Sequence, residues 1–80
     1  MSVTDRIIAT VRKNASEEIR ITLGEYNGRP IAGLRVWFEA EDGTMRPGKA
    51  GIAFKIELLG AVADGVRAAH EAARDKRLLP

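Results

Sequence analysis

Arg35 and Trp37 are the two side chains of this 80-residue sequence best suited to binding a ligand together. They lie two positions apart in residues 31–40, a stretch whose alternation is typical of a half-buried strand. Residues two apart share one face of a strand, so the cation and the ring would lie side by side. Such a pair can hold a phosphate and stack a base. The alternative is that Trp37 only covers the sheet surface and Arg35 is a solvated charge.

The other face of the same stretch is apolar throughout. The positions that alternate with Arg35 and Trp37 are therefore expected to face a core; they are Ala32, Leu34, Val36, Phe38 and Ala40.

The residue types of the sequence give little support for a catalytic site or a metal-binding site. His70 is the only histidine and there is no cysteine, so a zinc site of the usual ligands cannot be assembled. The few hydroxyls have no base at a plausible spacing. Glu39, Glu41 and Asp42 could bind a divalent cation, but Asp42 followed by Gly43 is fully explained as a turn. We expect a protein that is not an enzyme and that needs no metal or cofactor.

The bulk composition indicates one small intracellular domain. Apolar residues make up 45% and charged residues 30% of the chain, with no apolar run long enough to span a membrane and no signal peptide. We expect an intracellular protein, in the cytoplasm or nucleoid if its source is bacterial. The net charge of +2 comes from the middle of the sequence, because the charges of residues 1–18 and 56–80 cancel. An anionic partner at the middle segment is therefore favoured.

Four strands are expected before the sequence pattern changes. Residues 6–12 fit either a short strand or a helix capped by Thr4, and we interpret them as a strand. Residues 18–26 alternate well, and the Asn27-Gly28 pair that follows is a strong hairpin signal because both positions need positive φ. By the same logic Asp42-Gly43 is expected to supply the next tight turn.

The last strand is expected to be irregular. Pro47 and Gly48 would interrupt a regular ladder, which predicts a bulge or an edge position between the turn and Phe54.

From about residue 56 the apolar period changes from 2 to 3.6 and predicts a helix to about residue 76. Its apolar seam suits pairing with another helix and includes Leu59, Val62, Val66 and Ala69. A parallel row of small residues, which includes Gly65, would allow another backbone to approach closely. These residues could instead all face the sheet, but two adjacent apolar seams exceed what one sheet face needs. Self-association would also supplement the marginal core of so short a chain, so we expect a homodimer.

Three segments of the sequence together resemble a known family. Residues 25–30 (Glu-Tyr-Asn-Gly-Arg-Pro), 34–38 (Leu-Arg-Val-Trp-Phe) and 42–52 (Asp-Gly-Thr-Met-Arg-Pro-Gly-Lys-Ala-Gly-Ile) are similar, in order and spacing, to the positive cofactor four family. Its members are transcriptional coactivators and single-stranded-DNA-binding proteins. The resemblance implies a curved four-stranded antiparallel sheet followed by one helix, a homodimer joined through the helices, and single-stranded nucleic acid bound on basic, aromatic ridges of the sheet.

The resemblance also implies roles for individual residues. Tyr26 matches a base-stacking aromatic of the family, and Phe38 matches the second, whereas alternation places Trp37 beside Arg35; a bulge would reconcile the two assignments. The matching basic positions of the binding surface are Arg29, Arg35, Arg46 and Lys49. Gly24 and Ala50 replace basic residues of the eukaryotic members, which predicts weaker and less salt-sensitive binding.

Taken together, the sequence predicts an α+β fold of type ββββα in a single domain, residues 1–80. The sheet is expected over about 6–54 and the helix over about 56–76, with frayed ends at 1–5 and 77–80. The predicted function is non-enzymatic, coactivator-like binding of single-stranded DNA with little sequence preference, with transcription or replication proteins as further partners. The alternatives are RNA as the ligand and a protein-interaction module on the same fold.

Overall fold

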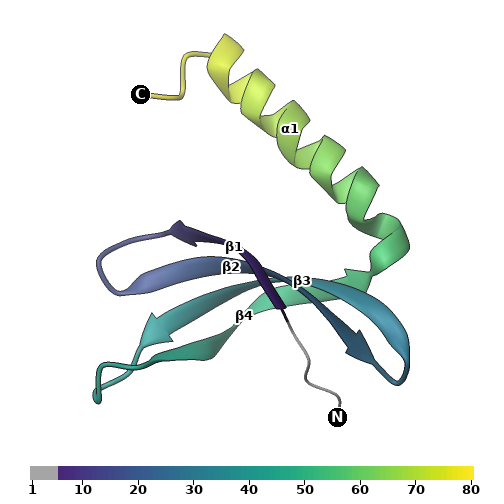
Figure 1. Ribbon diagram of the computed structural model, residues 1–80. Helices are drawn as coiled ribbons and strands as arrows, with labels where there is room; N and C mark the ends of the chain where they lie inside the picture. Colours follow the sequence, from purple (N-terminus) through teal and green to yellow (C-terminus); the bar gives the residue numbers. More distant parts are fainter. Residues whose placement is uncertain (1–5) are drawn as a thin grey trace.

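The computed structural model describes residues 6–80 as one antiparallel sheet followed by a helix (Figure 1). The elements in chain order are β1 (Arg6–Arg12), β2 (Glu17–Tyr26), β3 (Arg29–Glu39), β4 (Met45–Lys55), a 3-10 turn η1 (Ile56–Leu58) and α1 (Leu59–Asp75). The strands lie side by side in the order β1-β2-β3-β4. The predicted ββββα fold is therefore confirmed, including the strand interpretation of residues 6–12. Of the ends expected to fray, residues 1–5 lie outside the described residues, and residues 77–80 follow the helix without regular structure.

The hairpin between β2 and β3 fixes the register of the central strands. Asn27 and Gly28 have φ values of 53° and 79°, the two positive values that a two-residue type I′ turn requires. Tyr26 pairs with Arg29 next to this turn, and the ladder then runs without a shift to the pair of Glu17 and Phe38. The predicted hairpin is confirmed.

The turn between β3 and β4 is built differently from the expectation. Only Gly43 has positive φ, at 85°, so the prediction that Asp-Gly would repeat the Asn-Gly geometry is wrong. The Gly43 amide donates to the Ala40 carbonyl at 2.9 Å, and the Ala40 amide donates to the Thr44 carbonyl at 2.8 Å. This is a three-residue loop, in which one left-handed residue suffices. Asp42 stabilises it as an acceptor, since its Oδ1 receives the Thr44 amide at 3.0 Å and the Thr44 hydroxyl at 2.7 Å.

The edge strand β4 carries the predicted bulge. Arg35 pairs with Gly51, but Trp37, two residues further along β3, pairs with Pro47, so three residues of β4 lie opposite one of β3. The loop of extra backbone passes close to β3: a Cβ on Gly51 would lie 2.7 Å from the Leu34 carbonyl oxygen. Glycine is therefore required there by the close approach of the two backbones.

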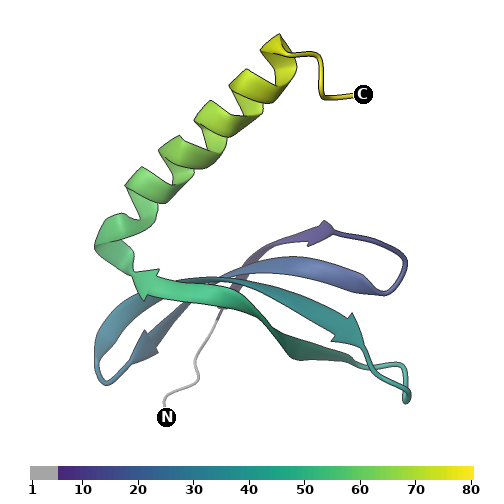
Figure 2. The ribbon, with the colours of Figure 1, turned by 180° about the vertical axis from the view of Figure 1, so that it is seen from behind.

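The sheet is arched, and α1 rises from the end of β4 on the outer side of the arch rather than lying on it (Figures 1 and 2). Ala32, 1% exposed, is the only fully buried hydrophobic residue among residues 6–80. Leu34 and Val36 are half-buried, and Phe38 is 39% exposed. The prediction that the even positions of residues 31–40 all face a core is therefore wrong for Phe38, which lies near the end of β3, where no other element of residues 6–80 buries it.

Within residues 6–80, no helix combines the length and the apolar character needed to cross a membrane.

Candidate functional site

The hairpin register lines up charged and aromatic side chains across three strands. Arg20 of β2 lies directly opposite Arg35 of β3, and Glu18 lies opposite Trp37. On the other side of β2, Glu18 pairs with Arg12 of β1. Because paired residues share a face, these five side chains form one group, which we call the arginine–tryptophan cluster.

The cluster lies on the sheet face directed away from α1. Ile21 and Leu34, the chain neighbours of Arg20 and Arg35, line the space between the sheet and the helix. Consecutive strand residues point to opposite faces, so Arg20 and Arg35 point to the inner side of the arch. The binding pair predicted from alternation, Arg35 and Trp37, is thus placed on one face.

The Trp37 ring is covered by an arginine that the sequence pattern did not single out. The Arg20 guanidinium carbon lies 4.2 Å from the centroid of the ring, a cation–π contact. Arg20 Nε donates to Glu18 Oε1 at 3.1 Å, and Arg12 Nη2 lies 3.7 Å from Glu18 Oε2. The Arg20 and Glu18 side chains are 17% and 15% exposed, so this contact is partly shielded from water.

The second central arginine is held by the bulge. Arg35 Nη1 donates to the Gly48 carbonyl at 3.0 Å and, more weakly, to the Lys49 carbonyl at 3.4 Å. Both acceptors belong to the extra residues of β4, so the bulge fixes the direction of the Arg35 guanidinium. Arg35 and Trp37 also line a hollow of about 380 Å³ on this face, whose other lining residues are Ile7, Thr22, Ile31, Gly33, Pro47, Ile52 and Ala53.

The remaining predicted binding residues lie in three places. Tyr26, 56% exposed, and Arg29 form the cross-strand pair at the β2–β3 turn, at the far end of the same face by alternation. Lys49 is exposed within the bulge. Phe38 and Arg46 are paired across β3 and β4 and line a separate hollow beside the β3–β4 turn.

Phe38 and Trp37 do not share a face. The bulge lies in β4, whereas β3 keeps an unbroken register with β2 through both rings. The expectation that a bulge would reconcile the two assignments is therefore wrong, since consecutive residues of β3 still point to opposite sides.

Arg46 already has an acidic partner at the turn. Its Nη2 donates to Asp42 Oδ2 at 2.9 Å. The pKa of Asp42 is lowered, mainly because the Thr44 hydroxyl donates to its carboxylate, with smaller contributions from the Thr44 amide and from Arg46. The pKa of Glu17 is lowered as well, first by the Asn14 side-chain amide and then by Lys13. Across residues 6–80, no three histidine or acidic side chains gather closely enough to hold a metal ion.

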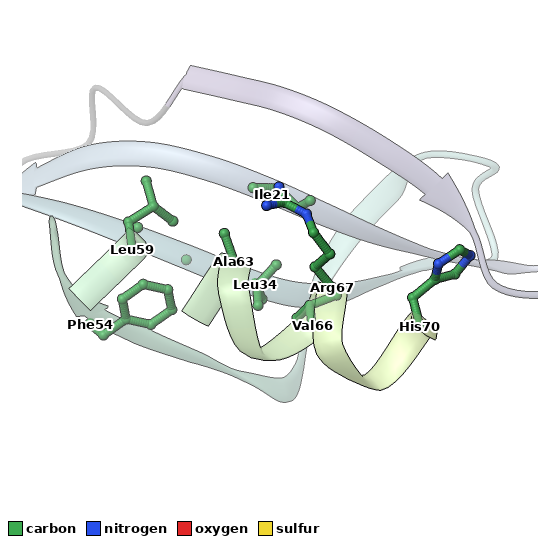
Figure 3. Close-up of a pocket in the computed structure, with 10 residues that line it drawn as sticks. Ile21, Leu34, Phe54, Leu59, Ala63, Val66, Arg67 and His70 are labelled. Carbon is green, nitrogen blue, oxygen red and sulfur yellow. The ribbon is translucent and has the colours of Figure 1, made fainter. Parts of the chain in front are cut away.

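A second feature is an apolar space of about 520 Å³ between the sheet and α1 (Figure 3). Of the seam residues predicted for helix pairing, Leu59 and Val66 line this space, while Val62 and Ala69 do not. Arg67 and His70 also line it, although the helical pattern had not singled out either for this position.

The cluster residues missed from the sequence are Arg12, Glu18 and Arg20. The signal for Arg20 and Glu18 was present in the Asn27-Gly28 turn. Counting outward from the pair that flanks this turn places Arg20 opposite Arg35 and Glu18 opposite Trp37, as the structure has them.

Comparison with known proteins gives a consistent set of similarities. The family model described as Transcriptional Coactivator p15 (PC4) matches residues 13–64. A PC4 homologue from Burkholderia pseudomallei is 35% identical in its orthorhombic crystal form, covering 81% of this chain and 88% of that chain with a TM-score of 0.76. In its tetragonal form the identity is 34%, the coverage 84% and 98%, and the TM-score 0.77.

A more distant structure shares the fold. The bacteriophage T5 homologue of the eukaryotic transcription coactivator PC4, implicated in recombination-dependent DNA replication, is 23% identical over 96% of this chain and 85% of that chain, with a TM-score of 0.64. No curated protein sequence matches the chain.

Proposed function

This chain belongs to the PC4 family of transcriptional coactivators, and from that premise we propose that it is a homodimeric, non-enzymatic protein that binds single-stranded DNA. The observation that carries the proposal is the arginine–tryptophan cluster on the open face of the sheet. Phosphates would lie along the arginines, and unpaired bases would stack on exposed rings, at about 1–3 kcal/mol per base.

The charge of the face supports an anionic ligand. The cluster holds three guanidinium groups, those of Arg12, Arg20 and Arg35, against the single carboxylate of Glu18. Arg29 and Lys49 are exposed and add further positive charge along the sheet. The Tyr26 ring is open to solvent and could stack on an unpaired base. A base in a duplex could not reach the ring, because that base is already paired and stacked on its neighbours.

The homodimer is supported by the apolar space under α1. A single chain leaves this space open and fully buries only Ala32 among residues 6–80, which is too little core for a stable fold. Apart from its chain neighbours and the backbone of its own helix, a Cβ added at Gly60 or Gly65 would meet nothing within 4 Å among residues 6–80. Contacts within this part of the chain therefore do not explain these costly helical glycines. We propose that the helix of a second copy covers the space and approaches the backbone closely, with Leu59, Val62, Val66 and Ala69 in the interface.

The test is a binding comparison that uses Trp37 as the reporter. Trp37 is the only tryptophan, so a change in emission reports directly on the cluster. Oligothymidine of about 20 bases, matched duplex and matched RNA would each be titrated at two salt concentrations. We expect the oligothymidine to bind at low salt, with a log–log salt slope of roughly −3 to −4 for about four to six phosphate contacts. Equal affinity for duplex would overturn the stacking mechanism, and no binding at low salt would favour a protein-interaction module.

The cellular role proposed from the family is coactivator-like, with transcription or replication proteins as partners. Tighter binding of RNA than of DNA in the same titration would instead assign RNA as the ligand, because the 2′-hydroxyl is what distinguishes the two.

A further inference from the structure

We propose that Arg20, positioned by Trp37 and Glu18, forms with Arg35 a two-arginine clamp for a single phosphate of the bound strand. The inference rests on the proposed function, since it names the contact that the cluster makes with single-stranded DNA.

Arg20 and Arg35 form an unfavourable pair of like charges. Arg20 and Arg35 lie directly opposite each other on one face of an antiparallel pair. Side chains in this relation have Cβ atoms only about 5 Å apart, and like charges there are destabilising. Glu18 is shared between Arg20 and Arg12, and Arg35 is held by backbone carbonyls, which carry no full charge. An anion between the two central arginines would relieve the repulsion.

The Arg20 side chain is oriented before any ligand arrives. The Arg20 guanidinium carbon lies over the Trp37 ring, 4.2 Å from its centroid, and Glu18 accepts a hydrogen bond from Nε at 3.1 Å. That hydrogen bond uses the Nε side of the fork and leaves the terminal Nη groups for a further acceptor. A guanidinium fixed in this way loses little conformational freedom when it binds a phosphate oxygen.

The Arg35 side chain is oriented in the same manner. Its Nη1 is bound to the Gly48 and Lys49 carbonyls of the bulge, which accounts for only part of its five donor hydrogens. Two arginines thus project from neighbouring strands, each anchored at one side of its fork. This arrangement suits bidentate recognition of phosphate, which lysine cannot reproduce.

The roles of Glu18 and Trp37 follow from this geometry. Glu18 positions Arg20 and partly neutralises it, so it lowers affinity for anions in general while keeping the fork aligned. Trp37 contributes through the arginine stacked on it, and the ring face under Arg20 is closed to a base.

The experiment measures oligothymidine affinity and its salt dependence for Arg20→Gln, Arg20→Lys and Arg74→Gln. Arg74 is the matched control because it is an exposed arginine on α1, outside the arginine–tryptophan cluster, so that its substitution removes the same charge from another part of the surface. Arg20→Gln is expected to weaken binding about tenfold or more at low salt and to reduce the log–log salt slope by about 0.7. Arg20→Lys is expected to keep the slope and still weaken binding, since the charge remains and the fork is lost. Arg74→Gln is expected to change both quantities much less.

Several outcomes would overturn the clamp. An unchanged salt slope in Arg20→Gln, with weaker binding, would mean that Arg20 only supports Trp37. Equal losses in Arg20→Gln and Arg74→Gln would mean that Arg20 acts only through the general surface charge of the protein. If wild-type protein binds oligothymidine but Arg20→Gln binds equally well, the clamp is wrong and the proposed function stands. If the wild type does not bind, the proposed function itself fails. Circular dichroism of each variant confirms that the sheet is intact.

Discussion

Truncation of Val66 is expected to weaken the proposed dimer by a calculable amount. Val66 lines the space between α1 and the sheet, yet it is 62% exposed in the single chain. Val66→Ala removes two carbon groups worth about 0.8 kcal/mol each when fully buried. If the partner covers the fraction now exposed, the loss is about 1 kcal/mol per chain and about 2 kcal/mol per symmetric dimer, or about 30-fold in the dissociation constant.

Sedimentation equilibrium over a range of protein concentrations measures this constant. Glu71→Ala is the matched control, since Glu71 is exposed on the same helix and does not line the space; we expect it to change the constant by no more than about twofold. Val66→Asp is expected to yield monomers or unfolded chains, because it would bury an unpaired charge. A compact wild-type monomer, or a Val66→Ala dimer as tight as the wild type, would refute the assignment of the apolar space to a second copy.

Three further predictions concern the sheet. Gly51→Ala is expected to lower the unfolding free energy by about 1–3 kcal/mol, because its Cβ would lie 2.7 Å from a carbonyl oxygen of β3; an unchanged melting temperature would contradict this. Thr44→Ala is expected to raise the pKa of Asp42 in an NMR titration, since the lost hydroxyl is the main cause of its depression. Because that folded-state pKa lies below the unfolded value, the contribution of Asp42 to stability is present above the ordinary aspartate pKa and is lost as the pH falls through the folded value. Tyr26→Ala should weaken oligothymidine binding with the salt slope unchanged, whereas its cross-strand partner variant Arg29→Ala should make the slope shallower by about 0.7; identical slopes would argue against stacking on Tyr26.

The sequence was most informative where the structural cause is local. Asn27-Gly28 determines its turn by steric constraints on two adjacent residues, so the hairpin followed directly from the sequence. Pro47 lacks an amide hydrogen and Gly48 lacks a side chain, so an irregular β4 also followed. Asp42-Gly43 was misjudged because the length of a loop, which decides how many left-handed residues it needs, depends on where the flanking strands stop pairing.

The sequence was less informative where the cause is a contact between strands. The positions of Arg20 and Glu18 over and beside Trp37 depend on register across β2 and β3, which no pattern within one strand reveals. Phe38 is apolar and occupies one of the even positions that alternation assigned to the core face, but no other element of residues 6–80 buries it at that end of β3. The anchoring of Arg35 by the bulge likewise required the backbone path of β4.

The order of the strands has a consequence for how the chain folds. Strands that follow one another in the sequence are also neighbours in the sheet, so each pairing closes only a short connection. These connections are residues 13–16 between β1 and β2, 27–28 between β2 and β3, and 40–44 between β3 and β4. Short loop closures favour rapid folding, and a type I′ turn such as that at Asn27 can nucleate the central hairpin. Refolding is therefore expected to show a fast phase that is independent of protein concentration, in which the sheet forms. If the proposed dimer is correct, a slower phase that accelerates with concentration follows, in which α1 meets the second copy. Stopped-flow fluorescence of Trp37 would follow the first phase, because that ring lies on the sheet face remote from the helix.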